Sequence, residues 1–143
     1  METSWLARAT VRGGRAAIPL PFDPEVEWGP KQRHDACGTV AGRTVRGKLE
    51  READGWVFPL GPAWWRDADL DPATAPELPT TLRPEGPLLE ELAPDVRAAM
   101  EASPEAVATF YAIAPHYRKN VVRWIETARG PETRAARIVD GVA

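Results

Sequence analysis

The chain has 143 residues, of which 43% are hydrophobic and 27% charged, and its formal net charge is −3. This length suits one compact domain or a small module with an appendage, and it can bury a core without metal or disulfide support. The negative charge disfavours a general nucleic-acid-binding protein. Cys37 is the only cysteine, which excludes an intramolecular disulfide and a thiolate metal cluster.

The N-terminal segment METSWLARATVRGG lacks the apolar stretch of a secretion signal. No apolar run along the chain approaches the ~18 residues that a membrane-spanning helix needs. Together with the single cysteine, these features predict a cytoplasmic protein without a membrane partner.

The first 86 residues predict short β-strands separated by turns. Six or seven strands are expected within residues 5–13, 16–22, 36–52, 55–61 and 76–85. Gly42-Arg43 is expected to form a hairpin turn. Pro79 indicates an edge position for the last strand, because proline has no amide hydrogen to donate. Short strands in this number are typical of a small β-barrel or sandwich.

From Leu88 onward the apolar period becomes helical. The expected helices cover residues 93–103, a stretch from Pro104, residues 115–130, and a stretch from Pro131 to near Gly141. Proline at the first helical position and glycine after the last one mark these boundaries. The predicted fold is therefore α+β, with a small β-barrel domain at residues 1–86 and a bundle of three or four short helices at 87–143.

The helix expected at residues 115–130 carries one continuous apolar stripe. Its members recur at helical spacing and are Tyr117, Val121, Trp124, Ile125 and Ala128. We expect this stripe to face the core, while the charged residues, Arg118 among them, occupy the other faces.

Charge is unevenly distributed along the chain. Residues 114–137 hold six bases and two acids, whereas residues 67–105 hold ten acids and two arginines. The candidates for an anion site are Arg118, Lys119, Arg134 and Arg137, with His116 at a helix start. Arginine offers two parallel hydrogen bonds to an oxyanion, and a helix start offers free amide groups. The alternative is that these bases pair with acids of the same protein or face water.

Three aromatic residues are candidates for the wall of a ligand pocket. Trp64 and Trp65 are adjacent, so in an extended segment their side chains would point in opposite directions. Together with Tyr117 they could line a pocket by stacking. Core packing is the alternative for the two tryptophans.

The sequence offers little for catalysis or metal binding. His34 and Cys37 are three residues apart, and in a strand such side chains point to opposite faces, which disfavours a Cys37 nucleophile. Metal-binding spacings such as HxH, HExxH and CxxC are absent, and so are the glycine-rich nucleotide motifs. We therefore expect no metal and no cofactor.

The stretch HYRKNVVRWIETARGPETRAARI resembles the C-terminal helical signature of the YdeI/OmpD-associated family, also labelled bacteriocin-protection proteins. The stretches RHDACGTVAGRTVRGKL and GWVFPLGPAWWRDA are similar to the small β-barrel domain of unknown function that usually precedes it. The resemblance implies the fold and a bacterial protein related to stress or toxin tolerance. It implies no particular reaction.

These observations predict a non-enzymatic protein, monomeric or homodimeric. We expect it to bind a small anionic or aromatic ligand, or a partner protein, between the barrel and the helices. One alternative is a small enzyme that uses His116 and Tyr117 in the same cleft. The other is a nucleic-acid-binding small barrel, which the net charge disfavours.

Overall fold

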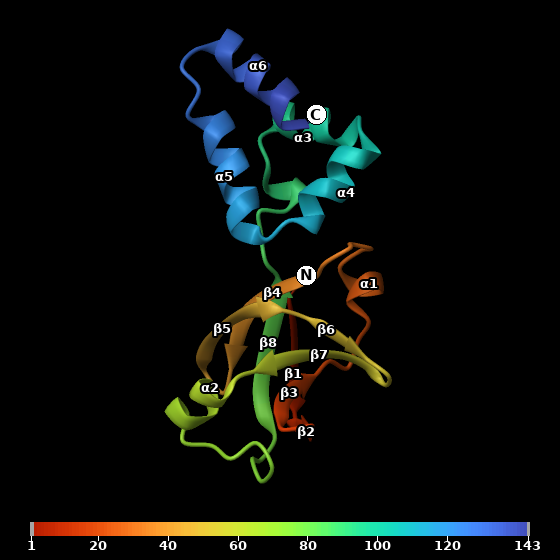
Figure 1. Ribbon diagram of the computed structural model, residues 1–143, viewed down its shortest axis with the longest axis vertical. Helices are drawn as coiled ribbons and strands as arrows, with labels where there is room; N and C mark the ends of the chain where they lie inside the picture. The colour runs from red at the N-terminus through yellow and green to blue at the C-terminus, as the bar shows by residue number, and fades with distance from the viewer. Residues whose placement is uncertain (1, 143) are drawn as a thin grey trace. The chain divides into compact units, whose positions relative to one another are not determined.

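The computed structural model describes residues 2–142, and the chain folds as two compact units. The first, called the strand unit, comprises Met1–Pro30 and His34–Pro84. The second, called the helical unit, comprises Lys31–Arg33 and Glu85–Ala143. Within residues 2–142 the strands lie in the strand unit and the helices of eight or more residues lie in the helical unit, which confirms the α+β class (Figure 1). The assignment of residues 1–86 and 87–143 to separate domains stays a prediction.

The strand unit contains two antiparallel sheets of four strands each. The strands are β1 (Thr3–Ala7), β2 (Thr10–Arg12), β3 (Arg15–Pro19), β4 (Asp35–Val40), β5 (Arg43–Lys48), β6 (Glu50–Glu52), β7 (Gly55–Leu60) and β8 (Leu78–Pro84). One sheet has the order β1-β8-β4-β5 and the other β2-β3-β7-β6. Within residues 2–142 there are eight strands, against the six or seven expected, and they form two four-stranded sheets, so the expected small barrel is not closed.

The core of the strand unit is formed by residues of both sheets. Ile18 of β3, Phe58 of β7 and Leu82 of β8 have at most 1% of their surface exposed. Burial alternates most clearly along β8, where Leu78, Thr80 and Leu82 are buried and the residues between them are more exposed. The core is continuous across the sheets, since Phe58 lies 3.4 Å from the position that a Cβ of Gly47 on β5 would occupy.

The hairpin between β4 and β5 turns one residue earlier than expected. Its two central residues are Ala41 and Gly42, with φ of 50° and 76°, rather than Gly42 and Arg43. A two-residue hairpin with positive φ at both central positions matches the right-handed twist of the strands. The twist requirement therefore outweighs the preference of Ala41 for negative φ.

The last strand is central in its sheet, which corrects the edge position inferred from Pro79. β8 pairs with β1 on one side and with β4 on the other. Pairing with β4 begins only at Thr80, one residue after the proline. The carbonyl of Pro79 accepts a hydrogen bond from the amide of Ala41 on that side. Pro79 itself lies beyond the last residue pair between β4 and β8, so its lack of an amide hydrogen removes no hydrogen bond from that pairing.

Two short helices lie within the strand unit, α1 (Pro24–Glu27) and α2 (Pro62–Asp67). Each begins at a proline, and the Asp23 side chain accepts the amide of Glu25 at the start of α1. Trp64 and Trp65 belong to α2 and are therefore not extended.

The helical unit contains a short 3-10 helix, η1 (Leu89–Glu91), followed by α3 (Pro94–Glu101), α4 (Pro104–Ala112), α5 (Pro115–Glu126) and α6 (Pro131–Val142). The four α-helices agree with the expected three or four, and each begins at one of the prolines that marked a start in the sequence. None of the helices within residues 2–142 is both long and apolar enough to cross a membrane.

The inward face of α5 differs from the predicted stripe. Tyr117 and Trp124 are 55% and 42% exposed, whereas Arg118 is 2% exposed and Ile125 is buried. The helix is thus rotated so that Arg118 faces the core and the two aromatic side chains face solvent. The rotation places the guanidinium group of Arg118 beside the rings of Phe110 and Tyr111, where a cation interacts favourably with an aromatic face.

Candidate functional site

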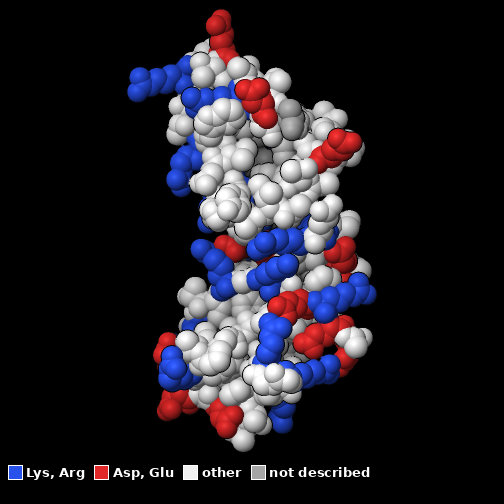
Figure 2. Space-filling model, in the orientation of Figure 1, with Lys and Arg blue, Asp and Glu red and all other residues white. Residues whose placement is uncertain are grey.

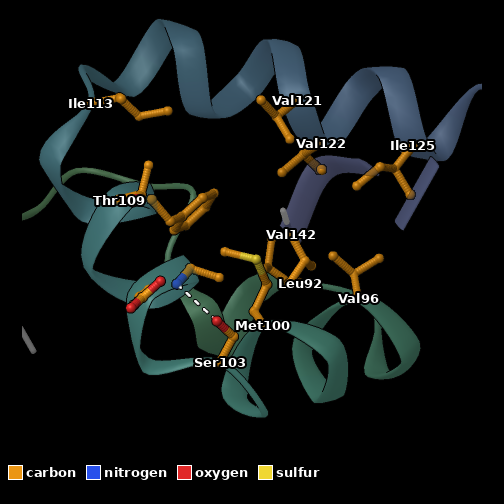
Figure 3. Close-up of a pocket in the computed structure, with 14 residues that line it drawn as sticks. Leu92, Val96, Met100, Ser103, Thr109, Ile113, Val121, Val122, Ile125 and Val142 are labelled. Carbon is orange, nitrogen blue, oxygen red and sulfur yellow. Dashed lines mark hydrogen bonds between the residues drawn. The ribbon is translucent and has the colours of Figure 1, made fainter. Parts of the chain in front are cut away.

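The helical unit contains a pocket enclosed by its four α-helices. The pocket has a volume of 340 Å³. The residues that line it are Leu92, Val96, Met100, Ser103, Glu105, Ala106, Thr109, Phe110, Ile113, Val121, Val122, Ile125, Gly141 and Val142. Figure 3 shows Val121 and Val122 of α5 pointing toward Met100, Leu92 and Val142 across the open space. The pocket therefore interrupts the core of this unit.

The positions of the helices follow from local signals at their starts. Ser103 caps α4, because its hydroxyl accepts the amide of Ala106 at 3.2 Å (Figure 3). The next residue, Pro104, is the first of the helix, where a missing amide hydrogen costs nothing. The cap fixes the direction in which α4 leaves α3, and so it fixes one corner of the pocket.

Three of the lining residues are polar, Ser103, Glu105 and Thr109. The hydroxyl of Ser103 already serves as the helix cap. Glu105 and Thr109 are exposed on α4, so they lie at the rim. Among the lining residues that the structure describes, Glu105 is the one that carries a charge, which gives the mouth of the pocket a negative charge.

The absence of a side chain at Gly141 shapes the far wall. A Cβ at this position would lie 3.3 Å from Cδ1 of Ile125 and 3.6 Å from Cγ1 of Val121. Glycine therefore lets the end of α6 approach α5 closely, and a larger residue would occupy space beside two of the lining residues.

Arg118, a predicted anion ligand, is buried beside the rings of α4. Its Nη1 donates a hydrogen bond to the carbonyl of Pro87 at 3.1 Å. Its guanidinium carbon lies 5.8 Å and 5.7 Å from the ring centres of Phe110 and Tyr111. In this position Arg118 joins α5 to the segment before η1 and to α4, and it does not line the pocket.

Arg134 contacts two carboxylates. Its Nε and Nη2 donate to Oδ2 and Oδ1 of Asp95 at 2.7 and 2.8 Å, and its Nη1 and Nη2 donate to Glu126 at 3.1 and 3.2 Å. The hydrogen bond from Arg134 lowers the pKa of Asp95 from its ordinary 3.8 to about 2, and the hydrogen bonds to both acids raise the pKa of Arg134. This matches the alternative of pairing within the protein.

Arg137 lies against the exposed aromatic residue of α5. Its Nη1 donates to the carbonyl of Trp124 at 2.6 Å, and its guanidinium carbon lies 5.3 Å from the Trp124 ring centre. The contact closes the C-terminal end of α5, where carbonyl groups lack helical partners. Arg118 thus lies near the N-terminal end of α5, whereas Arg137 of α6 contacts the C-terminal end of α5.

The remaining predicted residues of this unit lie on its surface. Lys119 and His116 are exposed on α5, and the rings of His116 and Tyr117 lie 3.9 Å apart. Figure 2 shows basic side chains projecting along α5. None of these three residues lines the pocket.

Trp64 and Trp65 belong to the strand unit. Their rings form an edge-to-face pair with centres 4.8 Å apart. Trp65 is 4% exposed and its Nε1 donates to the carbonyl of Leu60 at 3.1 Å. Trp65 is therefore a core residue, in agreement with the alternative that the tryptophans pack in the core.

The sequence did not predict this pocket, although two of its lining residues, Val121 and Ile125, belong to the apolar stripe predicted for α5. A signal for the α5 wall existed, because Val121 and Val122 are adjacent and small. Adjacent apolar residues widen the inward face of a helix beyond a single stripe.

A comparison with protein families matches residues 91–143 to the family described as Bacteriocin-protection, YdeI or OmpD-Associated. Every residue that lines the pocket falls within this stretch. The match also contains Arg118, Arg134 and Arg137. No curated protein matches the chain.

Proposed function

We propose that the helical unit binds an apolar small molecule, uncharged or cationic, in this pocket. The observation that supports the proposal is the pocket itself, 340 Å³ in volume and walled by apolar side chains of four helices. Small-molecule sites span about 300–1,000 Å³ and combine apolar walls with a few polar groups. The volume is at the lower end of this range, which favours a ligand with one to three rings or a short aliphatic chain.

The driving force for binding is the removal of apolar surface from water. Each square ångström of apolar surface that a ligand covers contributes about 25 cal/mol. Val121, Val122 and Ile113 are only partly buried, so a ligand could cover their remaining surface.

The charge around the pocket selects against anions. Glu105 at the rim would repel a negatively charged ligand and attract a cationic one. None of the basic candidates, Arg118, Lys119, Arg134 or Arg137, lines this pocket. An anion held by these four residues stays a separate prediction, as does a ligand site between the barrel and the helices.

The family match supports a biological role in tolerance of a toxic or stress-related compound. The matched stretch holds the whole pocket, and the family description names bacteriocin protection. If the role depends on the pocket, a strain whose own gene encodes a Val122→Phe protein should lose tolerance as a deletion strain does. The Val139→Phe strain should retain it, because Val139 is 68% exposed and lies outside the pocket.

Two fluorescent probes test ligand binding directly. N-phenyl-1-naphthylamine is uncharged, and 8-anilinonaphthalene-1-sulfonate is the related anion. We expect saturable fluorescence enhancement with the uncharged probe and weaker binding of the anion. Glu105→Gln should strengthen binding of the anion and leave the uncharged probe nearly unchanged.

Variants of the pocket decide where the probe binds. Val122→Phe places a larger side chain in the pocket. Thr109→Trp covers the rim, and because Thr109 is exposed this change should affect the stability of the fold little. Both should weaken binding of the uncharged probe by about tenfold or more, which corresponds to 1.4 kcal/mol, whereas the Val139→Phe control should bind as the wild type does. Equal binding by all four proteins, or no saturable binding, would contradict the proposal.

The other interpretations of the chain remain predictions. A partner protein, the enzyme alternative with His116 and Tyr117, and the nucleic-acid alternative each require residues outside the pocket. A cytoplasmic location likewise remains a prediction.

A further inference from the structure

The outward face of the sheet β1-β8-β4-β5 carries two rows of polar side chains. Ala36 and Val40 of β4 belong to the core, so Cys37 and Thr39 face outward. On β5 and β8, Val45 and Leu82 are likewise buried in the core. The neighbours of these core residues therefore lie on the opposite face of the sheet.

The first row places a cysteine between two arginines. Cys37 pairs in register with Arg46 on β5 and with Arg83 on β8. Adjacent strands are about 4.8 Å apart, so the two arginine Cα atoms flank the cysteine at roughly 10 Å from one another. Both arginines are exposed, whereas Cys37 is only 8% exposed. The Cys37 thiol is thus largely buried at the base of the surface, between two long basic side chains.

The second row consists of hydroxyl groups. Thr39 pairs with Thr44 on β5 and with Thr81 on β8. Ser4 on β1 continues the row, and its Oγ lies 2.8 Å from Oγ1 of Thr81. Same-face rows on a strand are two residues apart, about 6.6 Å, so hydroxyls and guanidinium groups are within reach of one small ligand.

A hollow of 520 Å³ covers both rows. Its lining residues are Glu2, Cys37, Gly38, Thr39, Thr44, Val45, Arg46, Thr81 and Arg83. The charged members are two arginines and one glutamate, so the hollow is basic with an acidic group at one edge.

Gly38 is necessary for this arrangement. Its φ is 155°, and a Cβ added there would lie 1.9 Å from the carbonyl oxygen of Thr81. Only glycine lets β4 approach β8 so closely at this point. The close approach brings Arg83 and Thr81 beside Cys37 and Thr39.

We propose that this face is an oxyanion site that takes the phosphate group of a small molecule. Arg46 and Arg83 would hold the phosphate from both sides above Cys37, since two guanidinium groups can each offer paired hydrogen bonds to its oxygens. The hydroxyl row would receive the polar remainder of the ligand. The proposal is independent of the pocket in the helical unit, because it concerns other residues and a ligand of opposite charge preference.

Inorganic pyrophosphate is the probe for the first test. It is titrated into the ¹⁵N-labelled full chain at constant ionic strength, with potassium sulfate as a second arm. We expect amide shifts that saturate and cluster at Thr39, Thr44, Thr81 and Arg83. Stronger shifts with pyrophosphate than with sulfate would identify phosphate groups as the preferred ligand, whereas equal shifts would contradict that preference. The absence of saturable shifts at these residues would overturn the site.

Charge-matched variants separate the site from general attraction. Arg46→Gln/Arg83→Gln should weaken pyrophosphate binding by about tenfold or more. Arg8→Gln/Arg43→Gln removes the same charge from exposed residues of the strand unit that lie outside the hollow, and it should bind nearly as the wild type does. Equal weakening in both double variants would overturn the proposal. Glu2→Gln should strengthen binding, because it removes the acid at the edge.

The single cysteine offers a second readout. Because Cys37 is the only thiol of the chain, its alkylation by uncharged iodoacetamide, followed by intact mass, reports on this site alone. Bound pyrophosphate should slow alkylation in the wild type and in Arg8→Gln/Arg43→Gln. In Arg46→Gln/Arg83→Gln the same protection should require a pyrophosphate concentration about tenfold higher or more, and equal protection at the wild-type concentration would count against the arginines as ligands.

Discussion

Arg134 in the first turn of α6 and Asp95 in the first turn of α3 are joined by two parallel hydrogen bonds between guanidinium and carboxylate. The same guanidinium reaches Glu126 at the end of α5. One side chain therefore connects three of the four helices that enclose the pocket. Arg134, which the sequence predicts as a ligand for an external anion, thus pairs with two carboxylates of the same protein.

Replacing Arg134 tests the geometry of this connection. Arg134→Lys keeps the charge but cannot form the planar two-bond contact. We expect it to lower the midpoint temperature of the helical unit by about 2–4 °C, close to the effect of Arg134→Gln. Circular dichroism at 222 nm measures the change. Arg129→Gln, an exposed basic residue between α5 and α6, is the control, and a lysine variant as stable as the wild type would show that charge alone suffices.

The Asp95–Arg134 contact also predicts a pH dependence. The pKa of Asp95 is about 2 in the folded protein against an ordinary 3.8, because Arg134 stabilises the ionised carboxylate. A lowered folded-state pKa stabilises the protein above the ordinary pKa, and this contribution disappears as the pH falls from about 4 to about 2. The difference in midpoint temperature between wild type and Asp95→Asn should therefore be full at pH 7 and vanish near pH 2. A difference independent of pH would refute this assignment.

Arg118 should contribute more to stability than any of the exposed bases. It is 2% exposed and donates to the carbonyl of Pro87, so Arg118→Ala removes both packing and a buried hydrogen bond. We expect a loss of about 2–3 kcal/mol in urea unfolding. Arg118→Met retains much of the stem and should lose less. Lys119→Ala, on the exposed face of the same helix, should stay within about 0.5 kcal/mol of the wild type.

Gly38 should tolerate no side chain. In Gly38→Ala the new Cβ would overlap the Thr81 carbonyl, and β4 could no longer pair with β8 as it does. We expect the variant to lose the dispersed amide spectrum of the strand unit or to melt far below the wild type. Gly61→Ala is the control, since nothing lies within 4 Å of its Cβ position and its φ is −72°. Equal stability of the two variants would contradict the close approach of the strands.

The helix starts were predictable from the sequence because they depend on local chemistry. Pro94, Pro104, Pro115 and Pro131 each begin a helix, as proline fixes φ near its helical value and lacks an amide that the first turn does not need. Alternation likewise predicted most strands. Pairing into two sheets was not predictable, because it depends on contacts between residues far apart in sequence.

The direction of the Arg118 side chain and the position of the pocket also escaped prediction. A periodicity argument treats arginine as a surface residue, yet Arg118 is buried with its guanidinium group beside two aromatic rings. The pocket arises from how four helices fit together, and no single helix encodes it. The candidate basic residues were chosen for their charge, whereas the structure shows Arg134 and Arg137 in contacts within the helical unit.

The prolines that begin the four helices have a consequence for how the pocket would receive a ligand. The connections between successive helices are short, covering residues 102–103, 113–114 and 127–130. Proline at each start prevents a helix from growing backward into its connection. The walls therefore have little freedom to slide or re-register around an occupant. Binding in such a preorganised pocket loses little conformational entropy, and selectivity would arise from rejecting molecules of the wrong shape rather than from adapting to them.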